Sequence, residues 1–315
     1  MVEVQNLRKA FGPTVAVDDV TFDVAKGEIL GFLGPNGAGK STTMRILTCY
    51  IPPDAGGARV AGFDIATQSI EVRRRIGYLP ENAPLYLDMY VTDYLQFVTE
   101  LRGLPVESRE RKIRAMIDLC GLGDVQHRLV GELSKGFKQR VGLAQTLIHD
   151  PEVLILDEPT TGLDPNQIVQ IRELIKRIGR EKTTLLSTHI LQEVEATCTR
   201  VQIINDGRLI AQGTTEELTS FATGEARVVM RVSAGRDRVE PKLRSLPGLK
   251  GLRDLGGPGE TGARFEVIVA GEEKDSATEE AIFRLAVESG WTLTELKRET
   301  QSLEQVFQKL TRGDA

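Results

Sequence analysis

The chain has 315 residues, which is more than one ordinary domain needs and enough for two. Its 40 Lys and Arg residues stand against 45 Asp and Glu residues, and this net charge of −5 argues against a general affinity for nucleic acid or anionic lipid. Hydrophobic residues make up 40% of the chain, which supports sizeable cores and excludes wholesale disorder. No apolar run is long enough to predict a membrane-spanning helix.

The N-terminus and the cysteines indicate the compartment. The first residues, Met1–Asn6, lack a basic patch followed by an apolar core, so we predict no signal peptide. Cys49, Cys120 and Cys198 are odd in number, far apart and never in a CxxC pair, so we interpret them as buried thiols. Free thiols are typical of a reducing compartment, and we expect a cytosolic protein.

Residues 1–220 have the pattern of an α/β domain, because short apolar runs alternate with amphipathic segments. The apolar runs at 28–33 and 153–156 are of strand length, as expected for strands with both faces covered. Between them, about residues 82–150, mostly helical patterns predict a helical insert. Further on, Pro165–Gly179 has a helical apolar stripe, and Asp206-Gly207 predicts a tight hairpin.

The pattern of the remaining residues predicts a separate small domain. Residues 221–226 form a candidate linker, and residues 227–315 predict an α+β domain. The predicted order is strand, helix, strand, strand, helix, strand, the split βαβ order of ferredoxin-like domains. A last helix follows, with a capping box at Ser302 and Gln305.

The most informative segment follows the first apolar run and precedes a helical pattern. It fits the phosphate-loop pattern G-x-x-x-x-G-K-[ST], in which glycines let backbone N–H groups curl around an anion. In this pattern Lys40 would reach the β- and γ-phosphates of a nucleotide, and the Ser41 hydroxyl would bind Mg²⁺. The loop consists of Gly34, Pro35, Asn36, Gly37, Ala38, Gly39, Lys40, Ser41 and Thr42.

A carboxylate pair ends the second apolar run. Successive side chains of a strand point to opposite sides, so Asp157 and Glu158 cannot do the same job. Asp157 suits the Mg²⁺ ion, and Glu158 suits the attacking water as a general base. The sequence therefore predicts a nucleotide and Mg²⁺ at a hydrolytic site.

With these motifs the sequence resembles the ATP-binding subunit of an ABC transporter. Leu133–Arg140 is similar to the family signature, Gly162–Pro165 to its D-loop, and Ser187–His189 to its switch histidine. The resemblance covers roughly residues 1–220 and implies a P-loop NTPase of ABC type, with a mixed sheet, helices and a helical insert. Residues 77–81, 159–166 and 302–307 most resemble bacterial export ATPases of the gliding-motility type, whose membrane subunit is a separate chain.

The resemblance implies that the nucleotide is ATP, and it implies further site residues. Ser134 and Gly136 would cover the nucleotide held by a second copy or a close paralogue, so that two chains enclose two ATP molecules. His189 would hydrogen-bond the γ-phosphate, Glu81 would help to bind Mg²⁺, and Phe11 would stack on adenine.

The sequence departs from the family pattern at four positions. Glu81 replaces the usual glutamine, and an exposed loop acid is the alternative interpretation. Lys135 and Phe137 replace a glycine and the glutamine of the signature, which we expect to alter dimer contacts. Phe11 stands in place of a tyrosine; stacking needs only the ring face, and a core position is the alternative.

These features together predict an ATPase that powers a separate membrane permease, most simply an exporter, from the inner face of the cell membrane. The helical insert would receive cytoplasmic helices of that permease. Two alternatives stay open: an ABC importer ATPase, and an ABC ATPase that acts on ribosomes or DNA without transport.

Overall fold

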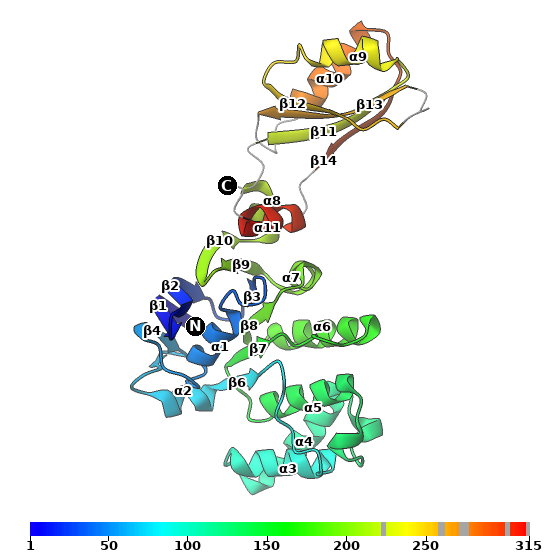
Figure 1. Cartoon of the computed structure of the whole chain (residues 1–315). Helices are drawn as coiled ribbons and strands as arrows, with labels where there is room; N and C mark the ends of the chain where they lie inside the picture. Colours follow the sequence, from blue (N-terminus) through cyan, green and yellow to red (C-terminus); the bar gives the residue numbers. More distant parts are fainter. Residues whose placement is uncertain (222–224, 258–261, 271–276, 300–302, 313–315) are drawn as a thin grey trace. The chain divides into compact units, whose positions relative to one another are not determined.

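The computed structural model describes residues 1–221, 225–257, 262–270, 277–299 and 303–312. It divides the chain into two compact units, Met1–Thr214 and Thr215–Ala315 (Figure 1).

The division between the units falls before the predicted boundary at residue 220. The reason is that α8 (Thr215–Phe221) packs against α11 (Leu303–Arg312), so it belongs to the second unit. The predicted linker is also corrected, because Phe221 ends α8 and Glu225 already begins a strand. The middle of that linker and Ser302 of the predicted capping box lie outside the described residues.

The first unit contains an antiparallel sheet that the sequence analysis did not separate from the mixed sheet. Its strands are β1 (Val2–Phe11), β2 (Thr14–Val24), β4 (Ala55–Val60) and β5 (Phe63–Asp64). They pair in the order β2-β1-β4-β5. In the second half of β2, the buried residues Val20, Phe22 and Val24 alternate with exposed ones, as the period of two predicts for a sheet with one covered face.

The second sheet of this unit is the predicted mixed sheet. Its strands are β3 (Ile29–Leu33), β6 (Ile76–Leu79), β7 (Val153–Asp157), β8 (Thr183–Thr188), β9 (Arg200–Asn205) and β10 (Arg208–Gly213). They lie in the order β10-β9-β3-β8-β7-β6, with β10 antiparallel to its neighbour and the rest parallel. The carboxyl ends of β3, β7 and β8 therefore meet at one edge, which positions the loops that follow them.

Two local predictions are confirmed at residue level. The turn between β9 and β10 has positive φ at both Asp206 and Gly207 (47° and 78°), as a tight hairpin of primed type requires. The helix predicted at Pro165–Gly179 is present with these bounds as α6. Its side-chain N-cap is Asp164, which accepts a hydrogen bond from the Gln167 N–H at 2.9 Å.

Helices cover the mixed sheet and form the insert. The others of this unit are α1 (Lys40–Leu47), α2 (Ser69–Arg75), α3 (Val91–Leu101), α4 (Val106–Cys120), α5 (Lys135–Leu147) and α7 (Leu191–Thr197), with short 3₁₀ turns at Gly123–Val125 and Val130–Glu132. Between β6 and β7, α3, α4 and α5 group together (Figure 1). Among the described helices, none is both long and apolar enough to cross a bilayer.

The mixed sheet separates two hydrophobic cores. On β7, Leu154 and Leu156 face the core that contains the insert helices, whereas Val153 and Ile155 face the core under the antiparallel sheet. The three cysteines are free, but only Cys120 is fully buried. Burial raises the pKa of the Cys120 and Cys198 thiols to about 12, so both are kept in the neutral form.

The second unit has the predicted order of strands and helices. Its elements before α11 are β11 (Glu225–Val232), α9 (Arg236–Leu243), β12 (Leu249–Asp254), β13 (Ala263–Ala270), α10 (Ala277–Glu288) and β14 (Leu293–Glu299). The sheet order β12-β13-β11-β14 with antiparallel pairing is that of a ferredoxin-like domain. Met230 and Phe265 are central to its core.

Candidate active site

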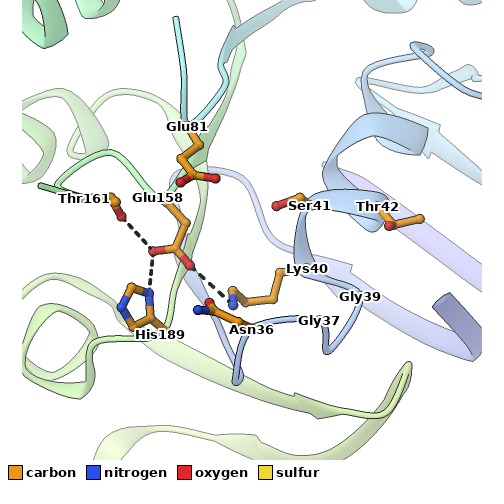
Figure 2. A pocket seen from close by; sticks show the side chains of 10 residues that line it. All are labelled: Asn36, Gly37, Gly39, Lys40, Ser41, Thr42, Glu81, Glu158, Thr161 and His189. Carbon is orange, nitrogen blue, oxygen red and sulfur yellow. Dashed lines mark hydrogen bonds and ion pairs between the residues drawn. The ribbon is translucent and has the colours of Figure 1, made fainter.

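A cavity of about 380 Å³ opens where the loops after β3, β6, β7 and β8 meet. Polar groups dominate its wall, and their side chains converge in Figure 2. The lining residues are Asn36, Gly37, Gly39, Lys40, Ser41, Thr42, Glu81, Glu158, Thr161 and His189. Six of the nine predicted phosphate-loop residues are in this wall. Gly34, Pro35 and Ala38 contribute to the loop through backbone groups instead.

The backbone of the phosphate loop needs glycine. Gly37 and Gly39 have φ values of 83° and 102°, which other residues rarely adopt. A Cβ atom on Gly39 would also collide with the carbonyl oxygen of Ala16. Gly39 is the N-cap of α1, so the free N–H groups of the first turn of this helix lie at the cavity and suit an anion.

Lys40 is a buried cation at the base of this loop. Its ammonium group donates to the carbonyl oxygens of Gly34 (2.8 Å) and Pro35 (3.1 Å). It also pairs with Glu158 Oε1 at 3.3 Å. Because Lys40 is only 5% exposed and its ammonium group lies in the cavity wall, it can form a charge-assisted hydrogen bond to a phosphate that enters the cavity.

Asp157 and Glu158 diverge from the end of β7, as strand geometry predicts. Asp157 Oδ1 accepts hydrogen bonds from the hydroxyls of Ser41 (3.0 Å) and Ser187. A carboxylate and a hydroxyl this close are the hard oxygen ligands that Mg²⁺ prefers, so the pair fits this ion. The described residues contain no group of three or more His, Cys, Asp or Glu side chains that could hold a metal.

Glu158 is a buried residue of the cavity wall and is only 7% exposed. Its Oε2 atom lies 2.8 Å from His189 Nδ1 and accepts a hydrogen bond from the Thr161 hydroxyl at 3.2 Å. With Lys40 on the other oxygen, it contacts groups from three loops (Figure 2). A carboxylate in this position can accept a proton from a water molecule in the cavity.

Glu81 lines the same cavity from the end of β6, and its carboxylate faces the other polar groups (Figure 2). Glu81 is exposed, as the alternative interpretation expected. It nevertheless lines the cavity, so its carboxylate is accessible to a ligand bound there.

Besides Gly34, Pro35 and Ala38, three more of the predicted nucleotide residues are not among those that line the cavity. Ser134 is exposed at the N-cap of α5, where its hydroxyl accepts the Phe137 N–H at 3.4 Å. Gly136 is buried against Gln167, and a Cβ atom would collide with that side chain. Phe11 is 51% exposed at the end of β1, so the alternative of a core position is wrong.

Two hydroxyl groups around Glu158 were not predicted from the sequence. Thr161 lines the cavity, and the Ser187 hydroxyl bonds to Asp157 and accepts the Glu158 N–H at 3.2 Å. The available signal was their position, since Thr161 follows the carboxylate pair closely and Ser187 precedes the switch histidine.

Comparison with known proteins agrees with this site and fold. The family described as "ABC transporter" matches residues 17–161. The linearmycin resistance ATP-binding protein LnrL of Bacillus subtilis (strain 168) is 33% identical over 78% of this chain and 79% of its own length. The chain therefore belongs to the ATP-binding proteins of the ABC transporter family, and it is an ATPase.

Two further matches are a second relative and a solved structure. The Nod factor export ATP-binding protein I of Ralstonia nicotianae is 37% identical over 71% of this chain and 70% of its own length. A solved ATP-binding subunit of an ABC transporter superposes with a TM-score of 0.63 at 31% identity, over 69% of this chain and 91% of that chain. The finer resemblance to the gliding-motility type stays a prediction.

Proposed function

We propose that this ATPase works as a pair of identical or closely related chains that enclose two ATP molecules and power a separate membrane exporter. The observation that carries the proposal is the convergence of Lys40, Glu158 and His189 on one cavity, while Ser134 lies outside it.

Within one chain, the charged groups of the cavity have roles that follow from their contacts. Lys40 and the N–H groups of the phosphate loop bind the β- and γ-phosphates of ATP. Ser41 and Asp157, whose side chains are hydrogen-bonded to each other, would hold Mg²⁺, with Glu81 as the additional carboxylate. When bound, the ion would supply positive charge against the phosphates.

Glu158 is the general base of the reaction. Its carboxylate accepts a proton from the attacking water, and His189 hydrogen-bonds the γ-phosphate. The contact between these two side chains supports this assignment, because it places base and phosphate ligand side by side. Phe11 stacks on the adenine ring, which suits an exposed aromatic side chain better than a core role would.

The second copy completes the site. Ser134 and Gly136 begin α5, where free backbone N–H groups and the serine hydroxyl can meet a phosphate. Since they do not line the cavity of their own chain, the nucleotide they cover is the one held by the partner. Closure of two chains around ATP excludes water and fixes the geometry of attack.

A second cavity supports the docking of a membrane subunit. It measures about 420 Å³ and lies beside the Glu81 loop. Tyr78 in its wall has its pKa raised to about 12, by burial and then by the charge of Asp157, so it stays a neutral hydrogen-bonding group. Close in sequence, Tyr86, Leu87 and Tyr90 are about half exposed. An apolar helix on the cytoplasmic side of a permease matches this surface. The cavity is lined by Arg45, Tyr50, Tyr78, Pro80, Asn82, Pro84 and Gln145.

Export is favoured over import by two relatives, one named as a resistance protein and the other as an export protein. The chain would then act at the cytoplasmic face of the cell membrane. Identification of the membrane chain that co-purifies with this protein tests the direction, because a substrate-binding lipoprotein in the complex would indicate import.

The substitution Glu158→Gln tests the catalytic assignment. It removes the base but keeps the shape of the side chain, so we expect ATP turnover to fall by at least about 100-fold while ATP affinity changes by less than about threefold. Glu152→Gln is the matched control, since Glu152 is an exposed acid just before β7 and pairs with Arg75. Near-normal hydrolysis in Glu158→Gln would contradict the assignment.

A further inference from the structure

Glu193 is a buried carboxylate next to the cavity but not in its wall. It lies in the first turn of α7 and is only 2% exposed. Its two oxygens accept hydrogen bonds from two threonine hydroxyls, Thr160 on one side and Thr188 (2.7 Å) on the other. Both threonines are buried as well, so the three side chains form a network shielded from water.

The two threonines belong to the two loops that carry the proposed catalytic groups. Thr160 comes two residues after Glu158, and Thr188 directly precedes His189. The Thr188 hydroxyl also accepts the N–H of Ile190, which fixes the chain on the far side of His189. Since Glu158 and His189 contact each other at 2.8 Å, the links form a closed ring through Glu193.

The backbone at Glu158 is one that needs support. Its φ value is 50°, in the left-handed region that a residue with a side chain rarely adopts. On one side, Ser187 holds the Glu158 N–H through its carbonyl (3.1 Å) and its hydroxyl (3.2 Å). On the other side, the Thr160 hydroxyl ties the chain to Glu193. The direction of the Glu158 carboxylate is therefore set from both ends.

We infer that Glu193 is a positioning residue for ATP hydrolysis, which holds the Glu158 and His189 loops in register through Thr160 and Thr188. The inference rests on the proposed roles of Glu158 and His189. The Thr188 carbonyl oxygen accepts the Gly34 N–H at 3.3 Å, but the side-chain hydrogen bonds of Glu193 do not reach the phosphate loop, so we expect Glu193 to act mainly on the hydrolytic step and to change ATP binding little.

The test is a comparison of steady-state hydrolysis in four full-length variants. Glu193→Ala removes both hydrogen bonds, and we expect kcat to fall about tenfold or more with KM for ATP within about twofold. Glu193→Gln should recover kcat to within about threefold of the wild type, because its amide oxygen can accept from Thr188 and its NH₂ can donate to the Thr160 hydroxyl. Thr160→Val, which removes one hydroxyl at constant volume, should lower kcat by about three- to tenfold.

Thr197→Val is the matched control. Thr197 is buried on the same helix, but its hydroxyl has no hydrogen-bond partner among the described residues. The kcat of the Thr197→Val variant should therefore stay at the wild-type value. Thermal unfolding of each variant is measured alongside. If Glu193→Ala does not fold, the near-isosteric Glu193→Gln and Thr160→Val variants decide.

Three outcomes would overturn the inference: wild-type kcat in both Glu193→Ala and Thr160→Val, an equal loss in Glu193→Gln and Glu193→Ala, or a KM that rises in step with the loss of kcat. The Glu158→Gln variant separates this failure from a failure of the proposed function. If Glu158→Gln is inactive while Glu193→Ala and Thr160→Val both keep wild-type kcat, only the role of Glu193 is removed, whereas an active Glu158→Gln removes the catalytic assignment itself.

Discussion

The phosphate-loop region and the signature region are both expected to bind nucleotide, but they are built differently. Lys40, Asp157 and Glu158 are buried; Lys40 pairs with Glu158, and Asp157 accepts a hydrogen bond from the Ser41 hydroxyl. Ser134, in contrast, is exposed, and its hydroxyl accepts a bond from its own helix. In the phosphate-loop region, the groups expected to bind nucleotide are already positioned by contacts within one chain. The signature region presents its serine to solvent, as expected if it binds the nucleotide of a second copy.

The largest expected effect comes from a substitution in the phosphate-loop region. Lys40→Ala removes the buried cation that faces the phosphates, and we expect ATP affinity to fall about 100-fold, since a charged partner of phosphate is lost from a shielded position. Equilibrium titration with ATP measures this directly. Lys176→Ala is the control, because Lys176 pairs with Glu173 on α6. Unchanged affinity in Lys40→Ala would show that the loop does not bind phosphate.

The second prediction concerns the helix that carries the signature. His149 follows α5 at the end opposite Ser134, and its Nε2 lies 2.9 Å from the Ile76 carbonyl oxygen on β6. Burial, with a smaller contribution from the charge of Arg102, lowers the pKa of His149 to about 4, below the value of about 6.5 expected in the unfolded chain. Between these pH values the unfolded chain binds a proton that the native chain does not.

The stability contributed by neutral His149 is therefore complete above about pH 6.5 and is lost as the pH falls toward 4. We expect the wild type to lose about 2 kcal/mol more than His149→Gln between pH 7 and pH 4.5, after allowance for partial solvent contact. Urea unfolding of both proteins at the two pH values measures the difference. Equal losses would contradict the buried, neutral state of His149.

The smallest expected effect concerns the exposed ring of Phe11, which is predicted to bind the adenine base. Phe11 is exposed, and its ring is free to stack on a base, with the Lys9 ammonium 5.7 Å from the ring centroid. Loss of the ring in Phe11→Ala should raise KM for ATP about fivefold, which corresponds to about 1 kcal/mol of stacking. Phe11→Tyr keeps the ring face and should behave as wild type. If the two variants are equal, adenine does not stack there.

The parts of the site that could be predicted from the sequence are those formed by residues that are adjacent in the chain. The phosphate loop and the Asp157-Glu158 pair depend on local backbone geometry at the end of a strand, which the residue pattern determines. Parallel pairing of β3, β7 and β8 then brings Lys40, Glu158 and His189 together.

Other features depend on contacts between distant segments and could not be predicted. Glu193 sits in a helix of ordinary amphipathic pattern, and only the fold brings Thr160, 33 residues earlier, to its carboxylate. The unit boundary at Thr214 depends in the same way on the packing of α8 against α11, near the far end of the chain. Phe11 was ambiguous because one aromatic residue at a strand end has no periodicity to separate core from surface.

The central claim, that two chains enclose ATP between the phosphate loop of one and the signature of the other, is tested by the mass of the Glu158→Gln protein in solution. With ATP and Mg²⁺, sedimentation should show a change from 34.7 kDa to twice that mass with two nucleotides bound, and Ser134→Ala in this background should weaken the pairing. A protein that binds ATP at full occupancy and keeps the mass of a single chain would contradict the claim.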